Sequence, residues 1–184
     1  MIIAFVAPKQ YGKSTACNIL KKYWGDDVVQ VNFKDALITE IKQNFPDLLQ
    51  EIAKDWPLTD TETIDDLFIQ KPPLIRTLMQ NYGTEVRRGD NQYYWINEWI
   101  KNILTQPKTK HILVDDVRFI NESNAIKMHG GILIRLIRTD KTNTDTHQSE
   151  TEQESIKCDY EITCNAGEFD KLETELLTIV KSMI

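Results

Sequence analysis

A glycine, a lysine and a serine near the start of the chain could bind the phosphates of a nucleotide. Gly12, Lys13 and Ser14 follow the apolar stretch Ile2–Val6 and precede a segment whose apolar residues have helical spacing. In the phosphate-loop (P-loop) pattern, a glycine and four other residues precede Gly-Lys-Ser/Thr, and backbone N–H groups at the helix start surround a phosphate. Lys13 would then reach the transferred phosphate and Ser14 would ligate Mg²⁺. This segment predicts a donor site for ATP and Mg²⁺.

The match to the P-loop pattern has one irregularity. Ala7 stands where the pattern has its first glycine, and alanine is tolerated there if its φ is negative. Gly-Lys-Ser at a helix start can also occur by chance, but the strand before it and the amphipathic helix after it favour a functional loop. The predicted donor-binding residues are Gly12, Lys13, Ser14, Thr15 and Arg138.

A polar face within residues 74–87 could bind a phosphorylated acceptor. Its members are Arg76, Gln80, Gly83 and Arg87, at i, i+4, i+7 and i+11. Arginine captures a phosphate with two parallel hydrogen bonds, and glutamine could bind a base or a sugar. A solvated surface is the alternative. Gly83 favours a site, because glycine costs up to about 1 kcal/mol inside a helix and suggests a close ligand or a sharp helix end. Trp95 is either a core residue or a cover for a nucleobase.

Two aspartates and an arginine follow the apolar segment 112–114. In open α/β sheets the carboxyl ends of strands line the ligand crevice, so a carboxylate here could bind Mg²⁺ and an arginine could bind phosphate. Neighbouring residues of a strand point in opposite directions, so Asp116 is favoured for the site and Asp115 for a helix contact or the outer shell of the metal. Glu122 could hold the guanidinium of Arg118. The alternative is a charged loop with a capping aspartate.

A polar stretch over residues 139–154 is the predicted lid, within limits of about 138–155. A cover that excludes water protects a phosphoryl group from hydrolysis. Arg138 at its root is expected to touch donor phosphates. His147 is a candidate general base, with a solvent-facing or lid-packing histidine as the alternative. A base is scarcely required, because a phosphomonoester with a second pKa near 6 is largely dianionic at pH 7.

Alternating strands and helices predict an α/β fold with a parallel sheet of about five strands flanked by helices. The expected strands are residues 2–6, 28–31, 111–115, 132–137 and 160–164. The expected helices are residues 13–24, 34–44, 74–82, 93–104, 121–129 and 168–183. Residues 1–184 are expected to form a single domain, with about 34–105 as a helical acceptor-binding region. Residues 45–71 carry no motif, and their role is open.

Composition argues against polymeric and membrane partners. The net charge is −6 and the pI is near 5.1, whereas binders of nucleic acid polymers or anionic membranes usually need a basic surface. No run approaches the roughly 18 apolar residues that span a bilayer. Three cysteines without zinc spacing indicate reduced thiols, so a cytoplasmic location is expected.

Several segments together resemble the bacteriophage deoxynucleoside monophosphate kinases over nearly the whole chain. The segments are residues 9–15, 76–85, 94–95, 115–122 and 147–150. The most specific are Gln-x-x-Gly-Thr-Glu from Gln80 and Asp-Asp-Val-Arg-Phe-x-Asn-Glu from Asp115. The resemblance implies a P-loop kinase fold with a helical acceptor-binding insertion and a short lid.

The resemblance also implies transfer of the γ-phosphoryl group of ATP-Mg to deoxynucleoside 5′-monophosphates, for phage DNA precursors in the host bacterial cytoplasm. It implies acceptor binding by Arg76, Gln80, Gly83, Thr84, Trp95, Asp116, Arg118 and Glu122. Arg87 joins them from the polar face. Lys13, Arg118 and Asp116 are the expected catalytic residues, and Ser14 and Asp116 the expected metal ligands.

Two other functions stay open. A dephospho-coenzyme-A-kinase-like small-molecule kinase would share the loop but need a different acceptor pocket. A nucleotide-binding switch would need no acceptor, although the guanine-specific Asn-Lys-x-Asp motif of one such class does not occur in the sequence. The accepted bases, the preference for deoxyribose and the oligomeric state are left open, with a homodimer as one option.

Overall fold

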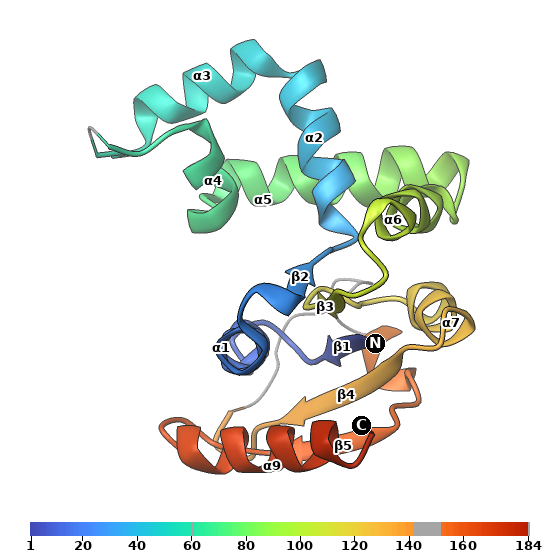
Figure 1. Cartoon of the computed structure of the whole chain (residues 1–184). Coiled ribbons are helices and arrows are strands. Elements are labelled where there is room, and N and C mark those ends of the chain that lie inside the picture. Colours follow the sequence, from blue (N-terminus) through green and yellow to red (C-terminus); the bar gives the residue numbers. More distant parts are fainter. Residues whose placement is uncertain (60, 142–151, 184) are drawn as a thin grey trace. The chain divides into compact units, whose positions relative to one another are not determined.

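The computed structural model describes residues 1–59, 61–141 and 152–183, and the chain forms two compact units (Figure 1). Unit 1 consists of Met1–Asn32 together with Ile100–Ile184, and unit 2 of Phe33–Trp99. Each unit has a hydrophobic core of its own.

Unit 1 contains a parallel sheet of five strands. The strands are β1 (Ile2–Val6), β2 (Val28–Gln30), β3 (His111–Val114), β4 (Ile132–Ile137) and β5 (Tyr160–Thr163), in the order β2-β3-β1-β4-β5. Every residue of β1 is buried, because β1 lies between β3 and β4 and both of its faces are covered. This burial explains why its sequence is unbroken by polar residues. The predicted α/β fold is confirmed, and three strands are one residue shorter than predicted.

Helices cover the sheet of unit 1. Alternate residues of β1, Ile3 and Phe5, pack in one core cluster with Leu20 of α1 (Lys13–Trp24) and Leu176 of α9 (Phe169–Lys181). The helix α7 (Ile120–Met128) packs against β4. Short 3₁₀ segments, η1 (Gly25–Asp27) and η3 (Glu152–Ser155), complete the unit.

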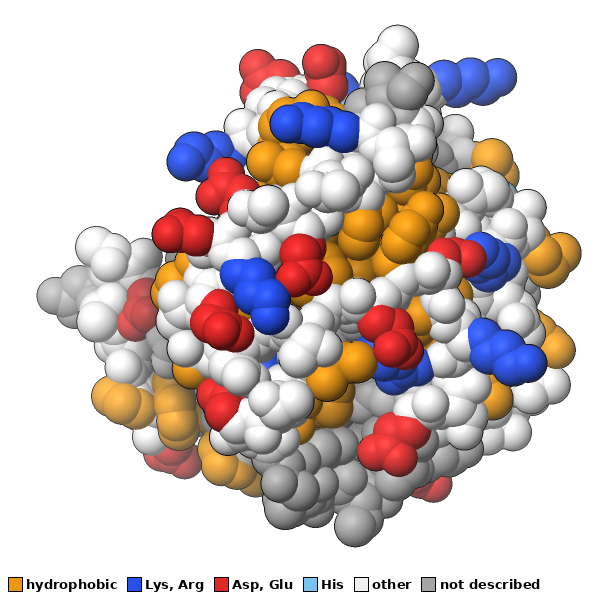
Figure 2. Space-filling view, turned by 90° about the horizontal axis from the view of Figure 1, so that it is seen from below, with side chains coloured by type: hydrophobic (Ala, Val, Ile, Leu, Met, Phe, Trp, Pro, Cys, Tyr) orange, Lys and Arg blue, Asp and Glu red, His pale blue; other side chains and the backbone are white. Residues whose placement is uncertain are grey.

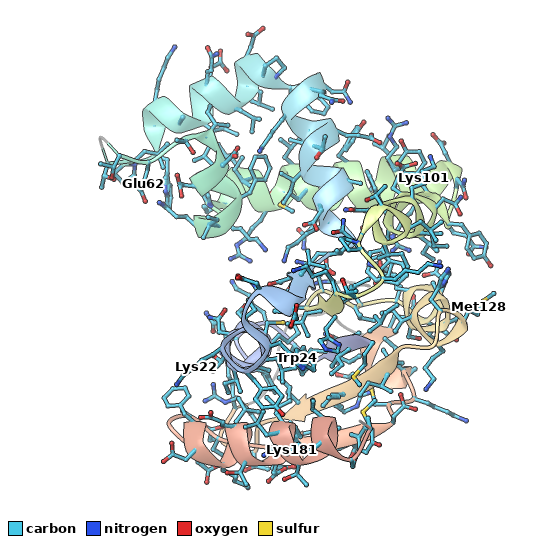
Figure 3. All side chains as sticks on the ribbon, in the orientation of Figure 1. Lys22, Trp24, Glu62, Lys101, Met128 and Lys181 are labelled. Carbon is cyan, nitrogen blue, oxygen red and sulfur yellow. The ribbon has the colours of Figure 1, made fainter. Side chains whose placement is uncertain are left out.

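The end of α1 is tied to the sheet by an aromatic contact. The ring of Trp24, which is labelled in Figure 3, lies at the end of α1. It stacks on the ring of His111 at the start of β3, with ring centroids 4.2 Å apart. Burial there lowers the pKa of His111 below its usual value, because the charged imidazolium loses hydration. Trp24 and His111 therefore anchor the helix that follows the predicted donor loop.

Unit 2 is helical. It contains α2 (Lys34–Asn44), α3 (Pro46–Asp55), α4 (Ile64–Gln70), α5 (Pro73–Gln80) and the π-helical η2 (Asn81–Arg88), and α6 (Tyr94–Thr105) runs from it into unit 1. Residues 45–71, which carry no motif, form α3 and α4. They contribute Leu49, Ile52, Leu67 and Phe68 to the core of this unit. Their role in the structure is thus to complete that core.

The helix around Gly83 differs from the prediction. A helix was expected over residues 74–82 with a sharp end at Gly83 as one reading, whereas the chain continues in π-helical turns through Arg88. Gly83 lies inside the helical segment and is buried. π-helical turns are rare and are often found at functional sites.

Charged side chains of both signs are interspersed among hydrophobic ones on the face seen in Figure 2, in keeping with a mildly acidic chain. In residues 1–59, 61–141 and 152–183, no helix is long and apolar enough to cross a membrane.

Candidate active site

The predicted donor loop connects β1 to α1. Gly12 is the residue before α1 and has φ 93° and ψ 7°, a left-handed conformation that glycine adopts without strain. Its carbonyl oxygen accepts the first helical hydrogen bond from Ala16 N, at 2.9 Å. The first turn of α1 contains no acidic residue, so nothing there opposes an anion at the positive end of the helix dipole.

Lys13 lies over this loop. Its Nζ donates hydrogen bonds to the carbonyl oxygens of Ala7 and Pro8, the latter at 2.9 Å. Ala7, the irregular position of the motif, is 2% exposed and its methyl group belongs to the core of unit 1. Among the described non-glycine residues, only Gln10 and Lys71 have positive φ, so Ala7 fits its conformation without strain. The irregularity is accommodated by packing.

Ser14 faces the carboxylate of a residue that directly follows β3, a neighbour of β1 in the sheet. Its Oγ lies 3.5 Å from Oδ2 of Asp115, which follows β3 and is 9% exposed. The backbone N–H of Asp115 donates to Oδ1 of Asn32 at 2.9 Å. The sequence favoured Asp116 as the partner of Ser14 at a metal, but the carboxylate that contacts Ser14 is that of Asp115. We therefore move the proposed metal contact to Asp115.

A hydroxyl and a carboxylate are suitable ligands for Mg²⁺, which prefers oxygen donors and often shares its shell with substrate phosphates. Within the described residues, no group of three or more His, Cys, Asp or Glu is placed to hold a metal by itself. Ser14 and Asp115 would supply two oxygen ligands to a metal that also binds nucleotide phosphates.

Glu122 shapes the turn that carries Arg118. Its Oε2 accepts hydrogen bonds from the backbone N–H groups of Arg118, at 2.8 Å, and Phe119, at 3.2 Å. Glu122 is 3% exposed and caps the start of α7. The sequence placed it against the Arg118 guanidinium, whereas these contacts are to the backbone. Its effect is to fix the backbone of Arg118 and Phe119 just before α7.

Arg138, at the root of the predicted lid, is held by one side chain and one backbone carbonyl group. Its Nε and Nη2 donate to the carboxylate of Asp140 at 2.9 and 2.6 Å, and Nη1 donates to Gln10 O at 3.1 Å. His147 lies outside the described residues.

In unit 2, Arg76 on α5 donates from Nε to the carbonyl oxygen of Lys71, at 3.0 Å. Gln80 is exposed at the end of α5, and Thr84 is half-buried in η2. Arg76 and Gln80 therefore lie one helical turn apart, as the spacing predicted.

Arg87 belongs to a cluster with Glu40, Tyr82 and Tyr94. Its Nε and Nη2 lie 2.9 and 2.8 Å from Oε2 of Glu40, and its guanidinium lies 5.3 Å from the ring centre of Tyr82 and 4.9 Å from that of Tyr94. The hydroxyl of Tyr82 donates to Glu40 Oε2 at 2.9 Å, and that of Tyr94 donates to Glu40 Oε1. One carboxylate thus receives three donors.

The cluster shifts the ionisation of its members. Burial acts to raise the pKa of Glu40, but the hydrogen bonds from Tyr94, Tyr82 and Arg87 together lower it. The hydrogen bond to Glu40, with burial, raises the pKa of Tyr94 to about 12. At neutral pH the cluster therefore holds a charged Glu40 and a protonated Tyr94.

Gly83 and Trp95 are joined by a hydrogen bond inside unit 2. The indole N–H of Trp95 donates to the carbonyl oxygen of Gly83 at 2.9 Å, and Trp95 is 4% exposed. A Cβ on Gly83 would lie 3.0 Å from Cδ2 of Leu37, closer than ordinary contact. These contacts give both residues a packing role. From the sequence, a core position was one of the two options for Trp95, whereas a close ligand or a sharp helix end was expected at Gly83.

Comparison with known proteins decides the family. Residues 54–176, well over half of the chain, match the family profile described as "Deoxynucleotide monophosphate kinase". The chain belongs to the deoxynucleotide monophosphate kinase family. Members of this family are phosphotransferases, so the prediction of an enzyme of this class is confirmed.

One relative of this family member is a viral protein. A protein of Acanthamoeba polyphaga mimivirus with the curated name "Putative deoxynucleotide monophosphate kinase" is 27% identical over 191 residues, which cover 98% of this chain and 96% of that one.

Solved structures with a similar course of the chain include shikimate kinase from Aquifex aeolicus and dephospho-CoA kinase from Campylobacter jejuni. Both have a TM-score of 0.47 and 14% identity to this chain. Each match covers 99% of this chain, together with 97% of the shikimate kinase or 96% of the dephospho-CoA kinase. At this level of similarity, the fold assignment rests on the sheet of the chain itself.

Some contacts of this family member carried no sequence signal. Glu40 lies in the middle of an amphipathic helix, where a charged residue ordinarily faces solvent, and its partners are 42 to 54 residues away. The left-handed conformation of Gln10 could not be predicted from the sequence either, because asparagine and glycine, not glutamine, are the residues that usually adopt it.

Proposed function

We propose that this protein transfers the γ-phosphoryl group of ATP to deoxynucleoside 5′-monophosphates, giving ADP and deoxynucleoside diphosphates. The observation that carries the proposal is the arrangement of the donor loop: left-handed Gly12, Lys13 over the loop, and Ser14 facing Asp115. Family membership supports the acceptor class.

On the donor side, the N–H groups at the start of α1 and the ammonium of Lys13 would bind the ATP phosphates. Lys13 would exchange its contacts with the carbonyl oxygens of Ala7 and Pro8 for phosphate oxygens. Gly12 and Thr15 would contribute to the same site. Mg²⁺, held by Ser14 and Asp115, would supply charge neutralisation.

On the acceptor side, the proposed residues are Arg76, Gln80, Gly83, Thr84, Arg87, Trp95, Asp116, Arg118 and Glu122. Arg76 would bind the acceptor phosphate, and exposed Gln80 would bind the base or sugar. For Gly83, Arg87, Trp95 and Glu122 the contacts described above favour a positioning role. Arg118 would stabilise the charge of the transferred group.

The resemblance to phage enzymes supports a role in supplying DNA precursors during viral infection, and the mimivirus relative agrees with a viral setting. We propose the bacteriophage-infected bacterial cytoplasm as the place of action, with small molecules rather than nucleic acid polymers as substrates.

The deciding experiment measures ADP release from ATP-Mg with each deoxynucleoside monophosphate, each ribonucleotide counterpart and dephospho-coenzyme A. We expect turnover with at least one deoxynucleotide and its loss in Lys13→Ala. Absence of acceptor-dependent ADP release with every deoxynucleotide contradicts the proposal. Turnover with dephospho-coenzyme A alone would favour the small-molecule kinase, and nucleotide binding without any turnover would favour a switch.

A further inference from the structure

Gln10 in the donor loop has an unusual backbone conformation. Its φ is 65°, in the left-handed region that costs free energy for any residue with a Cβ. Gly12, two residues later, reaches the same region without that cost. A non-glycine residue stays in such a conformation only where surrounding contacts hold it.

Three hydrogen bonds with residues 138–141 hold Gln10 and its neighbour Tyr11. Arg138 Nη1 donates to the carbonyl oxygen of Gln10 at 3.1 Å, and Lys141 Nζ donates to its side-chain Oε1 at 2.6 Å. The hydroxyl of Tyr11 donates to the carbonyl oxygen of Lys141 at 3.0 Å. The main chain and the side chain of Gln10 are therefore both fixed by the segment that follows β4.

Asp140 orients Arg138 for this contact. Its two carboxylate oxygens accept from Nε and Nη2 of Arg138, which leaves Nη1 directed at Gln10. The bidentate pairing adds geometric definition to the interaction. The hydrogen bond from Arg138 lowers the pKa of Asp140 to about 2, so the pair is charged at any pH at which the protein would act.

Asp140 is itself fixed by the loop between β5 and α9. Its carboxylate accepts from Ala166 N at 3.2 Å, and its own N–H donates to Oδ1 of Asn165 at 3.3 Å. Asn165 N in turn donates to Glu168 Oε2 at 2.7 Å, just before α9. A chain of contacts thus runs from the start of α9 through Asp140 and Arg138 to Gln10.

We propose that Asp140 is a positioning residue for the donor nucleotide, which acts through Arg138 to hold Gln10 in its left-handed conformation. The proposal rests on the proposed function, in which this loop binds ATP. It assigns Arg138 to the loop backbone rather than to the donor phosphates directly. A preformed loop loses less conformational freedom when the nucleotide binds, and this gain appears in donor affinity.

The test is Asp140→Asn, which keeps the side-chain size and removes the charge. We expect the KM for ATP to rise about two- to fivefold, the scale of a partly exposed ion pair, with the acceptor KM unchanged. Asp159→Asn is the matched control. Asp159 pairs with Lys127 and accepts a hydrogen bond from Leu133 N. It precedes β5, whereas the residues that hold Asp140 follow β5. The side chain of Asp159 is 31% exposed and that of Asp140 is 34% exposed. Asp159→Asn should leave the ATP KM unchanged.

A double-mutant experiment distinguishes an effect of Asp140 on the conformation of the donor loop from a direct contact of Arg138 with the donor phosphates. Gln10→Gly removes the cost of positive φ, so Asp140→Asn should change the ATP KM less in the Gln10→Gly background than in the original chain. An equal increase in both backgrounds overturns the proposal and returns Arg138 to the phosphates.

Amide hydrogen exchange provides a readout that does not depend on turnover. Without nucleotide, exchange in residues 8–13 should be faster in Asp140→Asn than in the original chain or in Asp159→Asn. Unchanged exchange overturns the proposal, even if the kinase activity is established. Faster exchange in a protein without any kinase activity would instead retain the contact chain and reject the proposed function.

Discussion

Ser14 Oγ lies 3.5 Å from the carboxylate of Asp115, which joins the donor loop to the end of β3. Asp115→Asn should therefore lower kcat by about 10- to 100-fold, the usual scale for a residue that supports a metal shell. Asp116→Asn is the matched control, and its effect should fall mainly on the acceptor KM. Steady-state kinetics at several Mg²⁺ concentrations measure both. A larger loss of kcat and Mg²⁺ dependence in Asp116→Asn would return the metal to the carboxylate that the sequence favoured.

Arg76 and Arg87 make different contacts and should respond differently to substitution. Arg76→Ala should raise the acceptor KM at least tenfold while the ATP KM changes little, because it removes a phosphate ligand from the acceptor side only. Arg87→Ala should mainly lower the melting temperature, because Glu40 then loses its half-buried ionic partner. Equal effects of Arg76→Ala on both KM values would contradict the assignment.

Gly83 and Gly89 provide a matched pair for the packing of η2. Gly83→Ala places a methyl group 3.0 Å from Leu37, and we expect it to lower the free energy of unfolding by about 1 kcal/mol. Gly89 has helical φ and ψ and no atom within 4 Å of an added Cβ, so Gly89→Ala should stabilise by up to about 1 kcal/mol. Urea unfolding measures both. Full stability of Gly83→Ala with a raised acceptor KM would indicate a ligand contact instead.

The Tyr94–Glu40 hydrogen bond predicts a pH dependence at the alkaline end. The pKa of Tyr94 is raised from 10.0 to about 12, so its contribution to stability is complete below pH 10 and is lost as the pH rises through 12. Ultraviolet titration should show one tyrosine that ionises about two pH units late, and it should be missing in Tyr94→Phe. Tyr93→Phe, a neighbour that is 50% exposed, should leave the late transition in place.

Local patterns predicted the sheet well, together with the strand before the proposed donor loop and the helix after it. Unbroken apolar runs such as Ile2–Val6 mark strands covered on both faces, and the bounds of α1 and α2 are those predicted from helical spacing. Features that depend on contacts between distant residues were not predicted from the sequence. The choice between Asp115 and Asp116 is set by the course of the chain after β3, and alternation along a strand does not determine which carboxylate meets Ser14.

Contacts between distant residues also limited the prediction for the proposed acceptor residues. The i, i+4 spacing placed Arg76 and Gln80 correctly, but the change to π-helical turns after Gln80 alters the spacing of every later residue. Arg87 consequently meets Glu40, from a helix that carries no motif. The packing of Gly83 against Leu37 likewise needs the tertiary structure, because the sequence alone allows a turn, a ligand or a neighbour at a glycine.

The central position of β1 determines when the first strand can be completed during synthesis. Ile3 pairs with Leu113 on one side and Ile132 on the other, so the first strand to emerge waits for more than a hundred residues before it has neighbours. Unit 2, whose core is built from residues near one another in the chain, has all of its partners earlier. We expect pulsed hydrogen exchange during refolding to protect the amides of Ile41 and Ile52 before those of Ile3 and Phe5. The donor loop would then be among the last parts of a nascent chain to fold. A ribosome-bound fragment that ends before β3 would be unable to bind ATP.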